Sequence, residues 1–241
     1  ADDEQSIGGR VRLEGRFNPR FKMAYTFSGD YTDQGAFPYG LYDTKSGIVA
    51  PVNINDPSSY KRTMLSNSLL TEYKVGNVQF SSTTGYQYLN DDMKMDQDFS
   101  PKSIFTLNQL QKQRAASQEF VLKNISLSQY QWSFGLYGFY NHLKTEGPVT
   151  FKEDGIKEVL QPVFDQIKEN VNNPKMPSLT ITDKELYIPG TFKTPSFGLA
   201  LFHQSTYNGL FTEGLSVTAG IRIDYEKQKM EYQSEAKMNM I

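Results

Sequence analysis

The sequence predicts an all-β fold: an antiparallel up-and-down transmembrane β-barrel, present in part as about eight strands of a larger barrel, with one amphipathic helix in a long loop. Three observations predict it. Apolar and polar residues alternate over stretches of roughly 10 to 14 residues, whereas strands of soluble sheets average about 5 to 6. Short and long connections alternate along the chain. Aromatic residues make up 13% of the 241 residues and gather near both ends of the alternating stretches.

The stretch at residues 21–32 shows the alternation most clearly. Its apolar face carries Phe21, Met23, Tyr25, Phe27, Gly29 and Tyr31. A period of two is the geometry of a β-strand with one apolar and one polar face. Tyr137 and Phe139 break the pattern in the strand expected at 132–142. The other expected strands lie at residues 6–18, 61–75, 78–88, 117–124, 197–207 and 215–226.

The lengths of the connections decide between a membrane barrel and a soluble sandwich. Short turns are expected at 18–19, 75–77, 124–130 and 208–214, and long loops at 33–60, 90–113 and 144–195. In an up-and-down sheet this order places every short turn at one end and every long loop at the other, which is the layout of outer-membrane barrels. We therefore expect the apolar face to contact lipid. Because the polar face is rich in Gly, Ser and Thr, too small to fill a closed eight-stranded barrel, we expect an open, curved sheet.

Composition excludes several classes of function. The net charge of −2 and the sequence pI of about 5.8 give no reason to expect nucleic acid as a partner. Without cysteine the chain forms no disulfide and no cysteine-ligated metal site. The two histidines, His142 and His203, have no serine or carboxylate at a spacing that predicts a catalytic triad. We therefore expect no enzyme activity, no cofactor and no metal.

The longest loop is expected to hold one helix at residues 155–171, kinked at Pro162. Helix packing on the crown of loops is favoured over a lid that contacts ligand, because apolar stripes usually bury locally. The expected stripe comprises Ile156, Val159, Leu160, Val163, Phe164, Ile167 and Val171.

Two long loops supply the candidate ligand-binding residues. The first loop offers three aromatic side chains that could grip a ligand or pack within the loop crown: Phe37, Tyr39 and Tyr42. The second offers four carboxylates: Asp91, Asp92, Asp96 and Asp98. A calcium site is possible in chemical terms, but the run lacks the glycine and the terminal glutamate of an EF-hand loop, so a solvated acidic loop is favoured.

Four segments, at residues 83–101, 118–124, 132–140 and 214–226, resemble the barrel region of TonB-dependent outer-membrane receptors. Members of that family have a 22-stranded barrel around an N-terminal plug and import siderophore-bound iron, cobalamin or glycans with energy from the TonB complex. The resemblance implies that residues 1–241 are a fragment of an outer-membrane β-barrel domain whose plug domain is absent.

By this resemblance the chain is expected in the outer membrane of a Gram-negative-type bacterium. Its expected partners are outer-membrane lipid, a small-molecule ligand, and the TonB complex through the missing plug region. A passive outer-membrane channel, or a structural or adhesive barrel, remains the alternative. No ligand residues carry over from the family, because its loop sequences diverge.

Overall fold

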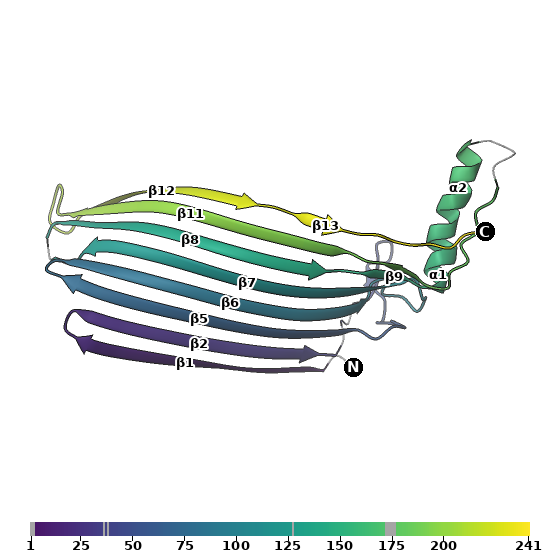
Figure 1. Ribbon diagram of the computed structural model, residues 1–241, viewed down its shortest axis with the longest axis horizontal. Coiled ribbons are helices and arrows are strands. Elements are labelled where there is room, and N and C mark those ends of the chain that lie inside the picture. Colours follow the sequence, from purple (N-terminus) through teal and green to yellow (C-terminus); the bar gives the residue numbers. More distant parts are fainter. Residues whose placement is uncertain (1–2, 36, 38, 127, 172–176) are drawn as a thin grey trace.

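The computed structural model describes residues 3–35, 37, 39–126, 128–171 and 177–241. Eight long strands, each hydrogen-bonded to its neighbour along the chain, form one antiparallel sheet (Figure 1). Their bounds are β1 Glu4–Asn18, β2 Phe21–Gln34, β5 Ser59–Val75, β6 Val78–Asp96, β7 Phe105–Asn124, β8 Tyr130–Glu146, β11 Thr191–Asn208 and β12 Ser216–Gln228. This order confirms the predicted up-and-down sheet. The sheet is not closed, because β1 pairs with β2 and β12 pairs with β11, and these two strands do not pair with each other.

Five short strands lie at the end of the sheet where the long loops gather. Strands β3 and β4 form a small hairpin of their own, β9 pairs with both β7 and β10, and β13 extends the pairing of β11. Their bounds are β3 Tyr42–Asp43, β4 Ile48–Val49, β9 Val149–Phe151, β10 Leu186–Ile188 and β13 Glu231–Gln233. Figure 1 shows the tight turns at the opposite end, so the predicted sorting of short and long connections is present.

The register aligns the apolar faces of neighbouring strands. Phe120 on β7 faces Leu136 on β8, which faces Leu201 on β11, which faces Ile223 on β12. All four side chains are exposed. A sandwich would bury this face, yet Tyr25 and Phe27 are 38% and 37% exposed. The apolar face is therefore the outward surface of a single sheet.

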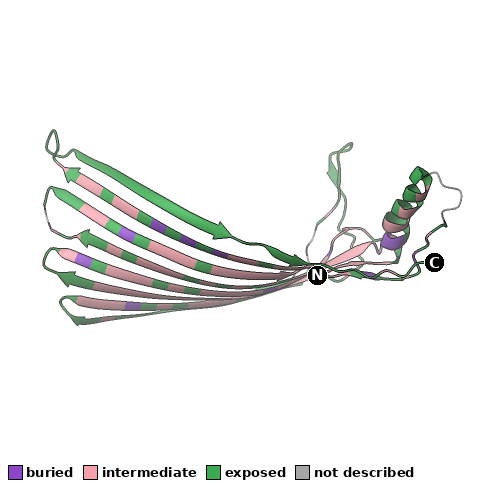
Figure 2. Cartoon of the chain, turned by 45° about the horizontal axis from the view of Figure 1, so that its top comes forward, coloured by how far each residue is buried: buried purple, intermediate pink, exposed green. Residues whose placement is uncertain are grey.

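The opposite face is polar and more enclosed. Its buried positions include Ala24, Thr32, Gln79 and Ala200, which alternate with the exposed apolar residues of the same strands. Figure 2 shows buried segments on strands between the two edges of the curved sheet, while β12 at one edge is exposed throughout. The sheet therefore has one apolar outward face and one polar inward face, as the alternation predicts.

The hairpin of β6 and β7 is longer than predicted. Residues 90–113 were expected to be a loop, but β6 continues to Asp96 and β7 begins at Phe105, so only residues 97–104 connect them. The short strand predicted at 117–124 is present, but it is only the second part of β7, which begins at Phe105. Between Phe105 and Ala116 polar residues occupy both faces, so the segment has no apolar alternation, and its backbone hydrogen bonds to β6 maintain the strand.

The predicted helix forms, with an irregular first part. A short α1 (Glu153–Gly155) leads into a π-helical turn η1 (Ile156–Leu160) and then α2 (Gln161–Val171). The expected irregularity at Pro162 takes the form of this wide turn directly before it, where the amide of Gln161 donates to the carbonyl of Ile156, five residues earlier. No helix within the described residues is long and apolar enough to cross a membrane.

Among the described residues, the apolar contacts of the helix with the rest of the chain lie at its base, and Lys168 further along donates to the Ser178 hydroxyl. Ile156 is buried with Ile181 and Leu186, and Leu160 and Phe164 contact this cluster. A Cβ on Gly155 would lie 2.1 Å from the carbonyl oxygen of Ile104, so glycine permits the close approach of the helix to the 97–104 loop. The rest of the expected stripe is exposed: Val159, Val163, Ile167 and Val171. For the part of the chain that the structure describes, apolar packing on the loop crown therefore involves the helix base.

Candidate functional site: the inward face and the loop crown

The outward apolar band has the same height on β8 and β11. On β8 it runs from Tyr130 to Tyr140, ten residues further on, and on β11 from Phe197 to Tyr207, again ten residues. Ten residues of strand span about 33 Å, which is about 24 Å along the barrel axis at a tilt of about 45°. The apolar band of outer-membrane barrels is about 25 Å tall. The dimensions of the outward face therefore match a lipid-facing belt.

A hollow of about 420 Å³ lies on the inward face over β5 to β8. Its floor is made of small residues, including Ser66, Gly85 and Ala115. A Cβ on Gly85 would lie 2.7 Å from the hydroxyl oxygen of Ser117, so a larger residue would crowd this floor. The volume falls in the range of small-molecule sites, roughly 300 to 1,000 Å³. The hollow is open and gives a ligand both polar and aromatic contacts.

Aromatic rings line one side of this hollow and continue toward β12. Tyr137 and Phe139, the two exceptions to the alternation, lie on the inward face with ring centroids 6.1 Å apart. Phe139 covers Gly198 on β11, where an added Cβ would lie 2.3 Å from the ring. Beyond them the guanidinium of Arg222 lies 5.6 Å from the ring centroid of Phe202. These side chains form an aromatic and cationic strip on an otherwise polar face.

A second polar cluster lies on the inward face nearer the loops. Arg62 forms an ion pair with Asp30 at 3.5 Å, and the Tyr60 hydroxyl donates to Asp91 Oδ2 at 3.5 Å. Asp91 Oδ1 and Arg62 Nε are buried and have no hydrogen-bond partner. Unpartnered buried polar atoms are costly. These two atoms are therefore able to receive polar groups of a ligand or of another chain segment.

The loop crown brings two of the predicted aromatic residues together. The rings of Phe37 and Tyr39 stack with centroids 6.2 Å apart. Phe37 also contacts Tyr60, and Tyr39 contacts Phe99 edge to face at 5.3 Å. Phe99 has a φ of 52°, an uncommon backbone conformation for a bulky residue. The cluster therefore ties the first long loop to the hairpin of β6 and β7.

Tyr42 lies apart from this cluster. It is on the β3–β4 hairpin, 62% exposed, and faces Val49 across the strand pair. The structure therefore brings Phe37 and Tyr39 together and leaves Tyr42 free to meet a molecule arriving from solution.

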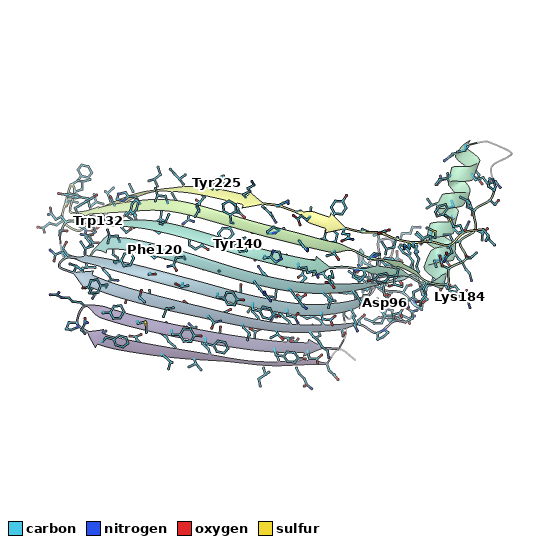
Figure 3. All side chains as sticks on the ribbon, viewed as in Figure 1. Asp96, Phe120, Trp132, Tyr140, Lys184 and Tyr225 are labelled. Carbon is cyan, nitrogen blue, oxygen red and sulfur yellow. The ribbon has the colours of Figure 1, made fainter. Side chains whose placement is uncertain are left out.

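Asp96 anchors the first loop. It lies at the loop end of the molecule, opposite Trp132 (Figure 3), and is only 1% exposed. Its Oδ2 accepts hydrogen bonds from the backbone amides of Asn55 and Asp56 at 3.1 and 3.2 Å, and its own amide donates to the Ser58 hydroxyl. Burial raises the pKa of this carboxyl, against the lowering effect of the two amides. Asp96 therefore holds the loop in place.

The other three aspartates point in different directions. Asp98 accepts hydrogen bonds from the Ser100, Ile104 and Phe105 amides and so closes the 97–104 loop. Asp91 faces inward, and Asp92, next to it on β6, faces outward opposite Leu110. No group of three or more His, Asp or Glu side chains among the described residues converges to hold a metal ion.

Sequence reasoning missed the inward-facing aromatic strip. Tyr137 and Phe139 were visible as breaks in the alternation, and this is the signal that could have located them. Phe202 and Arg222 carried the weaker signal of a large side chain on the face otherwise occupied by small residues. The cluster of Arg62 and Asp91 carried no signal, because it depends on the pairing of β5 with β6.

The sequence matches no family model and no curated protein. The fold is similar to the crystal structure of the ferric yersiniabactin uptake receptor FyuA from Yersinia pestis, with a TM-score of 0.65 at 17% sequence identity. The similarity covers 99% of this chain and 33% of that receptor chain, so the chain spans about a third of the receptor's length. At this identity the likeness establishes the fold alone. The sheet is built like part of the barrel of a transport receptor.

Proposed function

We propose that residues 1–241 are a fragment of the barrel domain of a TonB-dependent outer-membrane receptor in a Gram-negative-type bacterium. The full-length receptor imports a bulky small molecule, such as an iron–siderophore complex, cobalamin or a glycan. It acts as a transporter and not as an enzyme. The observation that carries the proposal is the sheet itself: an apolar outward band of bilayer height, a polar inward face, and a crown of loops at one end. Similarity to an uptake receptor supports it.

The ligand first meets the loop crown in this proposal. Loops held by a rigid sheet commonly carry recognition. Tyr42 offers an exposed aromatic surface, while Phe37 and Tyr39 fix the base of the loop. The ligand then passes along the inward face, where the hollow beside Tyr137 and Phe139 offers aromatic contact. The carboxylates Asp91, Asp92, Asp96 and Asp98 remain candidate contributors to this recognition surface.

Energy for import must come from outside this chain. The sequence contains no phosphate-binding GxxxxGK[ST] motif, so no nucleotide site of that kind is expected. We propose that the TonB complex supplies the energy through a plug domain located elsewhere in the full-length protein.

The experiment separates loop function from folding in the full-length protein. Residues 40–52 are replaced by a Gly-Ser linker of the same length, which removes Tyr42 but retains the segment at 53–58 that Asp96 holds. Barrel formation is measured by heat-modifiable mobility, and ligand binding and uptake are measured separately. We expect mobility to be retained while binding and uptake fall at least tenfold. A matched variant replaces residues 210–213, in the turn at the opposite end, and should leave binding and uptake unchanged.

Two outcomes would redirect the proposal. Unchanged binding after replacement of residues 40–52 would remove this loop from the binding site. Uptake that persists in cells lacking TonB would favour a passive channel instead.

A further inference from the structure

Three lysines face one another on the outward side of three adjacent strands. Lys112 on β7 is directly opposite Lys144 on β8, and Lys144 is directly opposite Lys193 on β11. Like charges at directly opposed positions destabilise a sheet. We call these three residues the lysine row. The row places three positive charges side by side on neighbouring strands, more than the nearby carboxylates offset, so it is a candidate anion-binding surface.

Further cations surround the lysine row on the same face. One step nearer the apolar band, Arg114 faces His142, and Lys227 faces Phe197 at the edge of the band. Lys229 lies beside Pro195, to whose carbonyl oxygen its backbone amide donates. The alternation of the strands places the side chains of Arg114, His142 and Lys227 outward. The cationic surface therefore extends across four strands.

Carboxylates neutralise part of this surface. Glu146 forms an ion pair with Lys144, Glu231 forms one with Lys229 at 2.5 Å, and Glu231 is also directly opposite Lys193 on β11. Asp92 lies on the same face, opposite Leu110 on β7. Within the described residues no carboxylate lies within 4 Å of the remaining cations: Lys112, Arg114, Lys193 and Lys227. Lys112, Arg114 and Lys193 are also exposed. A net positive charge is left on the surface.

The depth of the lysine row matches that of a lipid headgroup. Lys144 is four residues beyond Tyr140, the last aromatic residue of the apolar band on β8. Four residues span about 13 Å of strand, or about 9 Å along the barrel axis at a tilt of about 45°. Headgroup layers extend about 5 to 8 Å beyond the hydrocarbon core on each side. The methylene stem of a lysine lies along apolar surface while its ammonium stays in the polar layer. Stems that lean toward the band therefore bring the ammonium groups from about 9 Å to within the headgroup layer.

We propose that the lysine row, with Arg114, binds the phosphate groups of a phosphorylated lipid headgroup in the membrane leaflet at the loop end. Acyl chains of the same lipid lie against Tyr140 and Phe197 on the adjoining apolar band. This inference rests on the proposed placement of the apolar band in a membrane. A phosphomonoester carries close to two negative charges at neutral pH and accepts several hydrogen bonds, so one headgroup offsets most of the repulsion within the row. The surface faces outward, away from the route proposed for the imported ligand.

The test measures lipid binding by the purified full-length protein in dodecyl maltoside micelles. The probes are diphosphorylated lipid A, the same lipid after removal of both phosphates, and inorganic pyrophosphate. The main variant is Lys112→Gln/Lys144→Gln/Lys193→Gln. The control removes the same charge at exposed lysines outside the sheet, at the same end of the molecule: Lys45→Gln/Lys184→Gln/Lys237→Gln.

We expect the diphosphorylated lipid to bind the unmodified protein more tightly than the dephosphorylated lipid. The triple variant should lose on the order of 10- to 100-fold of that affinity, since each basic residue near an anionic lipid surface contributes about 1 kcal/mol, or about fivefold. The control should keep its affinity within about twofold of the unmodified protein. Replacement of the row by arginine, which keeps the charge, should also retain binding.

Three outcomes would overturn the inference: unchanged affinity in the triple variant, an equal loss in the control, or displacement of the lipid by an equal concentration of pyrophosphate. If the triple variant does not form a heat-modifiable barrel, Lys112→Gln and Lys193→Gln are measured singly, and each must weaken binding several-fold for the inference to stand. Cell fractionation measures independently whether the full-length protein is in the outer membrane. A protein found outside the membrane would contradict the proposed function, whereas a protein in the membrane that does not bind the lipid would contradict this site alone.

Discussion

Replacing Leu136 with arginine distinguishes a lipid-facing sheet from a water-facing one. Leu136 is on the outward face of β8, six residues from Tyr130 and four from Tyr140. These separations correspond to about 14 Å and 9 Å along the barrel axis, so the side chain lies close to the middle of the apolar band. It is 45% exposed and faces Phe120 and Leu201 across the neighbouring strands.

The two environments give different magnitudes. Arginine on the lipid face at the bilayer midplane destabilises a membrane barrel by about 2 to 4 kcal/mol, which is roughly 30- to 1,000-fold in the folding equilibrium. In water, a substitution at such an exposed position would change stability by no more than about 0.5 kcal/mol. The proposed lipid contact therefore predicts a loss several times larger than a soluble sheet would show.

The assay is reversible denaturant unfolding of the full-length protein in lipid vesicles, followed by tryptophan fluorescence. The matched control is Thr83→Arg, on the inward face. Thr83 faces Glu119, and Glu119 faces Tyr137, the residue next to Leu136, so Thr83 lies at nearly the same depth as Leu136. There the new guanidinium has water and the Glu119 carboxylate as partners, so the loss should stay below about 1 kcal/mol. Equal losses at Leu136 and Thr83 would refute the assignment of the two faces.

Further predictions concern the loop anchor, the inward face and the helix. Burial raises the pKa of Asp96, which lies beyond the apolar band, above the pKa of about 3.9 that it has in the unfolded chain. The stabilisation from the neutral carboxyl is therefore complete below about pH 3.9 and is lost as the pH rises through the pKa of the folded state. The protection of the amides at residues 53–58 against hydrogen exchange, relative to the intrinsic exchange rate at each pH, should therefore fall over this range, and Asp96→Asn should remove this change in protection. Gly135→Leu should destabilise the barrel by about 1 to 3 kcal/mol in the same unfolding assay, since an added Cβ would lie 1.9 Å from the Phe202 ring; an unchanged midpoint would contradict this packing. Lys102→Ala should leave the midpoint of thermal unfolding nearly unchanged, because its ion pair with Glu158 is about half exposed to solvent; a clear fall in the midpoint would contradict this.

Alternation predicted the strands well where the two faces meet different environments. Residues 21–32 follow the period of two because one face is apolar and the other polar along that whole stretch. The same rule failed at residues 105–116, where the strand extends beyond the apolar band and both faces are polar. With no clear difference between the faces, the sequence carries no periodic signal, and the strand is determined by its pairing with β6 on one side and with β9 and β8 on the other.

The candidate site was less predictable because it depends on segments that are distant in sequence. Asp96 is predicted to lie in a solvated loop, but it is buried, and its carboxylate accepts hydrogen bonds from backbone amides 40 and 41 residues away in the sequence. Tyr39 was named as a ligand contact, and its partner Phe99 comes from another loop. Tyr137 departs from the alternation because the inward face carries the aromatic strip beside the hollow, which single-strand periodicity does not describe.

The length of β6 and β7 determines the distance between the loop crown and the bilayer surface. On β6 the last aromatic residue of the apolar band is Tyr88, and the strand continues for eight more residues to Asp96. Those residues span about 27 Å of strand, or about 19 Å of height at a tilt of about 45°. In the proposed orientation the paired strands are a rigid stalk that lifts the aromatic crown clear of the headgroups. An incoming molecule then meets the crown before the lipid surface, and shortening the stalk by two residue pairs would lower this reach by about 5 Å without altering any contact within the crown.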